Sequence, residues 1–246
     1  MTSFDMDRLR IALITGAGGG LGAALAIALA RDGFALVVHY YNNAAGAAET
    51  QRTIEAAGGS AHVVQADLTA EAGALAVAAA VDAAYGSLDV LINNAGAFTD
   101  VRGIDLTSDE WRRGIDTTAT ATFFTTRACL PLLRAGAGKR IVNIGDSGAG
   151  RPGAYHDAWG YHIGKAGVWM LTRSFAAEEA VHGIAVNMVS PGILENSIGD
   201  VKKEWIPAGR LGTYADVAAV VRYLAGEAPA YLTGSNLVVS GGWNLR

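Results

Sequence analysis

The chain has 246 residues, a net charge of −4, and 51% hydrophobic against 17% charged residues. This composition excludes a disordered chain, and without a Lys or Arg cluster nothing favours the electrostatic binding of nucleic acids. No stretch approaches the roughly 18 apolar residues of a membrane span, and the N-terminus has no apolar signal segment, so we expect a cytoplasmic protein. No stretch has the composition of a linker, so residues 1–246 are expected to form one domain.

Short apolar segments recur along the chain, and a stretch with helical spacing separates each from the next. Segments this apolar are typical of strands buried on both faces, and strand and helix in alternation indicate a parallel sheet covered by helices on both sides. We therefore predict an α/β fold with a doubly wound parallel sheet of seven strands and six helices. The expected strands are residues 11–14, 35–38, 63–65, 90–92, 141–144, 185–189 and 237–239.

Two long helices are predicted in the second half of the chain. Residues 107–110, Thr-Ser-Asp-Glu, fit a capping box, which predicts a helix from Thr107 to about Arg134. Another helix is expected over about 158–181. Cys129 lies in the first of these helices and, as the only cysteine, has no partner for an internal disulfide, so we interpret it as part of the core.

A glycine-rich loop, residues 15–22, separates the first expected strand from a helix over 23–30. At such a place backbone amides and the helix N-terminus hold a pyrophosphate, and glycines are needed because any Cβ would keep the phosphate at a distance. Glycines also make tight turns, but their place after the first strand favours a dinucleotide site. The loop residues expected to bind the cofactor are Gly16, Gly18, Gly19, Gly20, Leu21 and Gly22.

The end of the second strand, where a carboxylate would bind the ribose of NAD, holds no acidic residue. A 2′-phosphate would meet no repulsion there, so NADP(H) is favoured, with NAD(H) as the alternative because no Arg or Lys is present either. After the third strand, Asp67 and Leu68 are expected at the cofactor, with Asp67 accepting from the adenine amino group, capping the next helix, or both. The expected strand-end contacts are His39, Tyr40, Asn42 and Asn43.

Tyr161 and Lys165 are four residues apart, so on a helix their side chains share one face. A free tyrosine has a pKa of about 10, and a nearby ammonium stabilises the phenolate, which lowers that pKa toward working pH. The pair therefore predicts a proton-transfer site on the helix over 158–181.

Four motifs in order resemble the short-chain dehydrogenase/reductase family over about residues 11–243. They are the loop 15–22, residues 93–96 (Asn-Asn-Ala-Gly), residues 161–165 as YxxxK, and residues 190–192 (Ser-Pro-Gly). The resemblance implies a Rossmann-like fold, a nicotinamide cofactor, hydride transfer to or from a small molecule, and a homotetramer built on the two long helices and the C-terminal segment. It also implies cofactor contacts by Lys165, Asn94, Ala95, Gly96, Tyr161, Pro191, Gly192 and Ile193.

Two positions depart from the family pattern. The family serine, which hydrogen-bonds the substrate carbonyl, aligns with Asp146, and Ser147 comes next. If the backbone is extended there, only one of the two side chains can face the nicotinamide. The family asparagine that anchors a proton-relay water aligns with Thr118, which we interpret either as a shorter relay group or as a core-facing helical threonine.

Asp146 bears on the substrate, because an ionised carboxylate only accepts hydrogen bonds and would suit a substrate with N–H groups. Pteridine reductases, a branch of the family, resemble this chain at Asp146, at Phe98, placed to stack on a planar ring, and at residues 39–40. They differ at Gly20 and Thr118. Our first hypothesis is a pterin-like substrate, and the alternative is a ketone or 3-oxoacyl-thioester reductase that uses Ser147.

Other classes are less well supported. Residues 145–148 are similar to the nucleophile segment of trypsin-like proteases, but that fold is all β. A non-catalytic nucleotide sensor would not need Tyr161 and Lys165. The five histidines show no metal-ligand spacing, so no metal is expected, and His162 is expected to point away from the site. Substrate specificity is assigned to residues 194–210, where Trp205 is a candidate contact.

Overall fold

The computed structural model describes residues 8–151, 153–197 and 202–245. Its centre is one parallel sheet with the strand order β3-β2-β1-β4-β5-β6-β7. All seven predicted strands are present. They are β1 (Arg10–Ile14), β2 (Phe34–Tyr40), β3 (Ala61–Gln65), β4 (Val90–Asn93), β5 (Arg140–Ile144), β6 (Ala185–Pro191) and β7 (Asn236–Val239).

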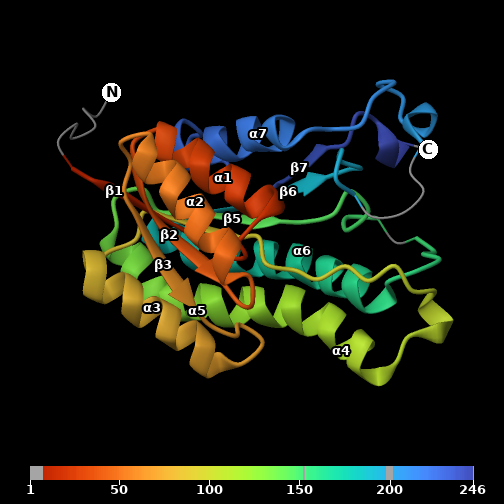
Figure 1. The fold of residues 1–246 in the computed structure, drawn as a ribbon, viewed down its shortest axis with the longest axis horizontal. Helices are drawn as coiled ribbons and strands as arrows, with labels where there is room; N and C mark the ends of the chain where they lie inside the picture. Colours follow the sequence, from red (N-terminus) through yellow and green to blue (C-terminus); the bar gives the residue numbers. More distant parts are fainter. Residues whose placement is uncertain (1–7, 152, 198–201, 246) are drawn as a thin grey trace.

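Helices cover both faces of the sheet, so the doubly wound prediction is confirmed (Figure 1). One layer contains α1 (Gly20–Arg31), α2 (Ala44–Ala56) and α7 (Tyr214–Gly226). The other contains α3 (Glu71–Tyr85), α4 (Ser108–Ile115), α5 (Ala121–Ala135) and α6 (Trp159–Glu179). In the described part of the chain, no helix has both the length and the apolar content needed to cross a membrane.

The helix predicted from Thr107 is present but is not regular throughout. Thr107 and Glu110 form the expected capping box at the start of α4. A π-helical turn, Asp116–Thr120, joins α4 to α5, so the chain stays helical to Ala135. The helix predicted over 158–181 corresponds to α6 and a following 3₁₀ turn, Ala180–His182.

The core lies in two clusters, one on each side of the sheet. Strand β2 contributes Leu36 and Val38 to the cluster under α1, α2 and α7, and Ala35 and Val37 to the cluster under α3 and α5. Cys129 is fully buried in the second cluster, where burial raises the pKa of its thiol to about 12, so it is core as predicted. Burial on both faces was wrong for β3 and β7, because these strands form the sheet's edges and are partly exposed.

A buried chain of polar side chains ties the central strands to the helices beside the site. Asn93 on β4 donates from Nδ2 to Asn143 Oδ1 on β5 at 2.8 Å and to Thr126 Oγ1 on α5 at 3.0 Å. Asn143 in turn donates to Thr172 Oγ1 on α6 at 2.9 Å. These hydrogen bonds hold the carboxyl ends of β4 and β5, where the loops of the site begin, in place relative to α5 and α6.

Replacing Asn143 with alanine should destabilise the fold by about 2 to 4 kcal/mol, because two buried hydrogen bonds are lost and a small cavity forms. Chemical denaturation would measure the free energy of unfolding. Asn42→Ala, at an exposed position, is the matched control and should change it by less than about 0.5 kcal/mol. Equal effects of the two substitutions would show that the buried network contributes nothing specific.

Candidate active site

The site begins where β1 and β4 lie side by side and their following loops diverge. Thr15, which follows β1, accepts at Oγ1 from the backbone N–H groups of Asn94 (2.9 Å) and Ala95 (3.0 Å). The Asn94 amide donates to the carbonyls of Thr15 (3.0 Å) and Gly16 (3.2 Å). These four contacts join the glycine loop to the loop after β4 and form one rigid floor.

At two positions of the loop, the fold itself requires glycine. Gly16 has a φ of +66°, in the left-handed region that few residues with a Cβ adopt. A Cβ at Gly22 would lie 2.3 Å from the Gly16 carbonyl oxygen, so only glycine lets the first turn of α1 pack against the loop. Gly20 and Gly22, both predicted to bind cofactor, line neither of the two cavities described below.

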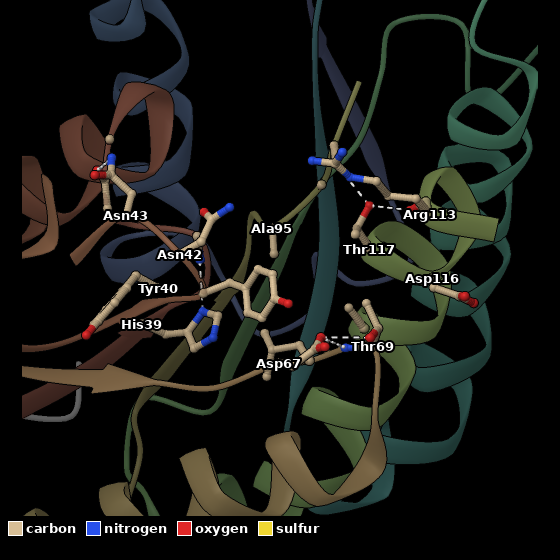
Figure 2. Close-up of a pocket in the computed structure, with 18 of the residues that line it drawn as sticks. His39, Tyr40, Asn42, Asn43, Asp67, Thr69, Ala95, Arg113, Asp116 and Thr117 are labelled. Atoms are coloured by element: carbon tan, nitrogen blue, oxygen red, sulfur yellow. Dashed lines mark hydrogen bonds between the residues drawn. The ribbon is translucent and has the colours of Figure 1, made fainter. Parts of the chain in front are cut away.

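A first cavity of about 760 Å³ lies over the carboxyl ends of β1, β2 and β3 (Figure 2). Its walls come from the glycine loop, the end of β2, the turn after β3, the loop after β4 and one face of α4. Most of the predicted cofactor residues gather there. They are Gly16, Gly18, Gly19, His39, Tyr40, Asn42, Asn43, Asp67, Leu68, Ala95 and Gly96.

The imidazole of His39 is a structural part of this cavity's wall. Its Nδ1 lies 3.1 Å from the N–H of Gly16, and its Nε2 lies 3.1 Å from the carbonyl oxygen of Ala66. Burial lowers the pKa of His39, so the ring is neutral, accepting at Nδ1 and donating at Nε2. Both ring nitrogens are therefore used to hold the glycine loop against the end of β3.

Asp67 does not cap the helix that follows it. Its Oδ1 accepts from the N–H (2.9 Å) and hydroxyl (2.7 Å) of Thr69, whereas α3 begins at Glu71 with Ala70 at the N-cap. The capping interpretation was therefore wrong, because the turn after β3 places Asp67 too early. Asp67 lines the first cavity, so its hydrogen bond with the adenine amino group stays a prediction.

The face of α4 that lines the first cavity was missed by the sequence analysis. It brings Arg112 and Arg113 to the nucleotide side of the site, and the π-helical turn that follows α4 brings Asp116 and Thr117. Thr117 accepts from the N–H of Ala97 at 3.0 Å and donates to the carbonyl of Arg113 at 2.7 Å, which ties α4 to the loop after β4. The capping box was the only sequence signal for this placement, because it sets the residue at which α4 begins.

A second cavity of about 630 Å³ adjoins the first at Gly96, which lines both. Tyr161 and Lys165 face it from α6, and Asp146 and Ser147 face it from the loop after β5. The other predicted residues that line it are Leu21, Asn94, Phe98, Pro191, Gly192 and Ile193. Side chains from five separate parts of the chain therefore meet at one place.

Lys165 is buried beneath Tyr161. Its Nζ donates to the carbonyl of Ile144 at 2.6 Å and lies 5.5 Å from the centre of the Tyr161 ring. Burial lowers the pKa of Lys165 to about 8, and the charge of Asp146 only partly opposes this. Burial and the Asp146 charge both raise the pKa of Tyr161, so the expectation of a lowered phenol pKa was wrong for the protein alone. Tyr161 is therefore a neutral phenol that can donate a proton.

Asp146 and Ser147 both line the second cavity. Strand β5 ends at Ile144, and the chain then turns, with Asp146 Oδ1 accepting from the N–H of Gly148 at 2.7 Å. The N–H of Ser147 donates to the Pro191 carbonyl at 3.0 Å. The expected alternation does not apply, because it required an extended backbone that has already ended.

Trp205 and His162 differ from their assigned places, whereas Thr118 agrees with the second of its two interpretations, a core-facing helical threonine. Thr118 is fully buried, donates to the Gly114 carbonyl at 2.6 Å and lines neither cavity, so its hydroxyl is used inside the helix. Trp205 also lies outside the cavity linings and stacks at 6.4 Å on Trp243, which does line the second cavity. His162 was expected to point elsewhere, but its ring lines the second cavity. Among the described residues, no group of three acidic, His or Cys side chains could hold a metal.

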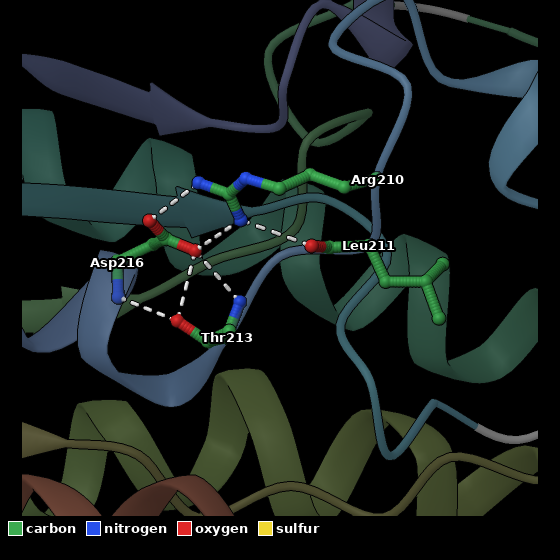
Figure 3. A network of polar contacts seen from close by, with 4 residues as sticks. All are labelled: Arg210, Leu211, Thr213 and Asp216. Atoms are coloured by element: carbon green, nitrogen blue, oxygen red, sulfur yellow. Dashed lines mark hydrogen bonds and ion pairs between the residues drawn. The ribbon is translucent and has the colours of Figure 1, made fainter.

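A polar network anchors the end of the segment that borders the second cavity (Figure 3). Arg210 donates from its two terminal nitrogens to the two carboxylate oxygens of Asp216, at 2.7 and 2.8 Å. Asp216 also belongs to the capping box that Thr213 makes at the start of α7, and these hydrogen bonds lower its pKa. The network therefore positions Tyr214, which lines the cavity.

The buried lysine predicts a pH-dependent stability. Below about pH 8, Lys165 is protonated in both the folded and the unfolded chain, whereas between about 8 and 10.5 only the unfolded chain binds the proton. The free energy of unfolding should therefore rise over this range, by up to about 3 kcal/mol relative to Lys165→Met, in which the group is absent. Denaturation of both proteins from pH 7 to 10.5 measures this difference, and parallel curves would contradict it.

Comparison with known proteins gives matches along nearly the whole chain. The family described as Enoyl-(Acyl carrier protein) reductase matches residues 16–244. A 3-oxoacyl-[acyl-carrier-protein] reductase of Synechocystis is 36% identical over 95% of this chain and 96% of its own. A 3beta-hydroxysteroid dehydrogenase of Eggerthella lenta is 34% identical over 98% and 96%. The crystal structure of acetoin dehydrogenase from Enterobacter cloacae matches with a TM-score of 0.86 and 31% identity, over 97% of both chains.

Proposed function

Because this chain belongs to the short-chain dehydrogenase/reductase family, we propose that it is an NAD(P)(H)-dependent carbonyl reductase in which Tyr161 donates the proton. One observation supports this above the others. The neutral phenol of Tyr161, the ammonium of Lys165 and the hydroxyl-bearing Ser147 line a single cavity that adjoins the nucleotide cavity at Gly96. A substrate carbonyl in the second cavity would therefore meet its proton donor beside the cofactor.

The residues present fit a nicotinamide dinucleotide. Gly16, Gly18 and Gly19 leave the first cavity free of side chains where a pyrophosphate would approach the backbone, and Gly22 keeps the N-terminus of α1 against the loop. Asn94 and residues 191–193 line the second cavity, where the nicotinamide would lie. When bound, the cofactor supplies or accepts the hydride.

The proton is handled by this chain's own residues. The Tyr161 hydroxyl gives its proton to the carbonyl oxygen, and the nearby Lys165 ammonium stabilises the phenolate that this leaves. Ser147 lines the same cavity, and its hydroxyl would donate a hydrogen bond to the same oxygen. Lys165 is itself held by the Ile144 carbonyl, so the position of the charge is set by the end of β5.

Carbonyl reduction is better supported than the pterin hypothesis. The relatives described above act, by their names, on 3-oxoacyl thioesters, a hydroxysteroid and acetoin, which are carbonyl compounds or their alcohols. Ser147 lines the cavity alongside Asp146. A hydroxyl that can bind the substrate carbonyl is therefore available, although Asp146 occupies the position of the family serine. A nucleotide sensor remains the second candidate only if turnover is absent.

The preference for NADP(H) remains part of this proposal. The end of β2 presents no carboxylate to the cavity, and Arg113 on α4 lines it without an ion pair among the described residues. We further propose a cytoplasmic homotetramer built on α4, α5, α6 and the C-terminal segment. Ile163 and Met170 are exposed on α6.

Tyr161→Phe should lower kcat by roughly 10² to 10⁴ while cofactor affinity stays close to that of the parent, because only the proton donor is lost. Steady-state kinetics on a panel of ketones, 3-oxoacyl thioesters, quinones and pterins would measure it, with cofactor fluorescence as the control for folding. On a ketone without a hydroxyl or amino group, Ser147→Ala should lose more activity than Asp146→Asn if the carbonyl interpretation is right. The reverse order would favour the pterin interpretation. If Tyr161→Phe kept most of its activity, the assignment of Tyr161 as the proton donor would be wrong.

NADPH should bind more tightly than NADH, because the first cavity has no carboxylate at the end of β2 and is lined by Arg113, whose guanidinium has no ion pair among the described residues. Fluorescence titration gives both dissociation constants. Arg113→Ala should reduce the affinity for NADPH several-fold more than that for NADH, which serves as the internal control. Equal affinities in the parent protein would refute the NADP(H) assignment.

A further inference from the structure

One wall of the second cavity is made of groups that accept hydrogen bonds. Asp146, Asp157 and His162 lie together there, and among the described residues that line this cavity the only Arg or Lys is the buried Lys165. Nothing in the proton transfer described above uses Asp157 or His162. We call Asp146, Asp157 and His162 the acceptor wall.

The imidazole of His162 lies between the two carboxylates. Its Nδ1 is 3.9 Å from Asp146 Oδ2, and its Nε2 is 3.8 Å from Asp157 Oδ1. Both distances exceed those of hydrogen bonds, and Nδ1 is buried without a hydrogen-bond partner among the described residues. The histidine therefore separates the two carboxylates. Among the described residues, Asp157 and the Oδ2 of Asp146 have no hydrogen-bond donor, whereas Asp146 Oδ1 accepts from the N–H of Gly148.

The ring is held in this position by aromatic neighbours. Tyr155 stacks on it with ring centres 3.8 Å apart and an interplanar angle of 15°. Phe98 meets it edge-on at 6.2 Å, and Tyr161 lies at 5.5 Å. Burial lowers the pKa of His162 despite the two carboxylates, so a neutral ring leaves their negative charge uncompensated. The acceptor wall is therefore preformed, and it lines the same cavity as the proton donor, Tyr161.

The backbone that carries Asp157 is also fixed. Asp157 pairs with Arg102 in an isolated antiparallel bridge, and Ala158 donates to the Val101 carbonyl at 3.0 Å. Ala158 has a φ of 47°, a left-handed conformation that residues other than glycine rarely adopt. This turn immediately before α6 places Asp157 opposite His162, which lies on the first turns of the helix.

We propose that the acceptor wall recognises a hydrogen-bond donor on the carbon next to the reducible carbonyl, so the substrate is a hydroxyketone or an aminoketone. The inference rests on the proposed carbonyl reduction and names its substrate class. Carboxylates accept hydrogen bonds and attract cations, so a hydroxyl or an ammonium is stabilised there. A donor-free ketone leaves Asp157 and the Oδ2 of Asp146 without a hydrogen-bond donor, and an anionic chain is repelled by the two carboxylates.

The test compares substrates that differ in one group. We would measure kcat/KM with the preferred cofactor for butan-2-one, 3-hydroxybutan-2-one and 3-aminobutan-2-one, with acetoacetyl-CoA as an anionic thioester. The hydroxyl and amino compounds should exceed butan-2-one by roughly 10- to 100-fold, which is the usual effect of one hydrogen bond to a charged group. The comparison between them shows whether a hydroxyl or a cation is preferred.

Asp157→Asn keeps the shape of the side chain but removes its charge, and should reduce the preference for 3-aminobutan-2-one over butan-2-one about tenfold. The matched control is Asp105→Asn, since Asp105 is exposed, pairs with Arg102 and lies outside both cavities. This control should leave the preference unchanged. Melting temperatures of both variants show whether they fold.

The outcomes separate this inference from the proposal on which it depends. If butan-2-one or acetoacetyl-CoA is reduced as well as the donor-bearing ketones, the enzyme is a carbonyl reductase but the acceptor wall does not select its substrate. A preference that Asp157→Asn leaves intact would also overturn the inference. If cofactor binds but none of the four compounds is reduced, the proposed function fails, and this inference fails with it.

Discussion

The structure depends on one constraint, that β1 and β4 are neighbours in a parallel sheet whose connections run to opposite faces. Their following loops must diverge, and a crevice opens between them at the carboxyl edge of the sheet. The Thr15 and Asn94 hydrogen bonds tie the two loops together at this point, so the floor of the crevice does not move with either loop alone. Both cavities lie above that floor and share Gly96.

The proton-transfer group contains a side chain, Lys165, whose burial opposes folding. A buried ammonium at Lys165 is costly, and its pKa falls to about 8, but the Ile144 carbonyl accepts from it and holds it beneath Tyr161. The polar chain through Asn93 and Asn143 steadies the strand end that supplies this carbonyl. The free-energy cost of burying the Lys165 ammonium is thus offset in part by the hydrogen bonds around it.

The two cavities differ in the cations that they offer to a ligand. Arg112 and Arg113 reach the nucleotide side from α4, although Asp67, Asp109 and Asp116 also line it. The other cavity holds Asp146 and Asp157, and its one lining cation among the described residues, Lys165, is buried and already donates to the Ile144 carbonyl. Guanidinium groups of the described residues are therefore available to a phosphate-bearing cofactor in the first cavity only. The carboxylates of the second cavity are the physical basis for proposing small hydroxy- or aminoketones over anionic thioesters.

The sequence by itself determined the seven strands, the glycine loop and the Tyr161 and Lys165 pair, because periodicity and i,i+4 spacing are local properties that the helix and sheet geometry preserve. Only the tertiary structure decided that Asp146 and Ser147 share a cavity, that His162 faces it and that Thr118 does not. These placements depend on the turn after β5, the left-handed Ala158 and the π-helical turn at residues 116–120. The direction of the Tyr161 pKa likewise follows from burial, which arises only when separate segments pack together.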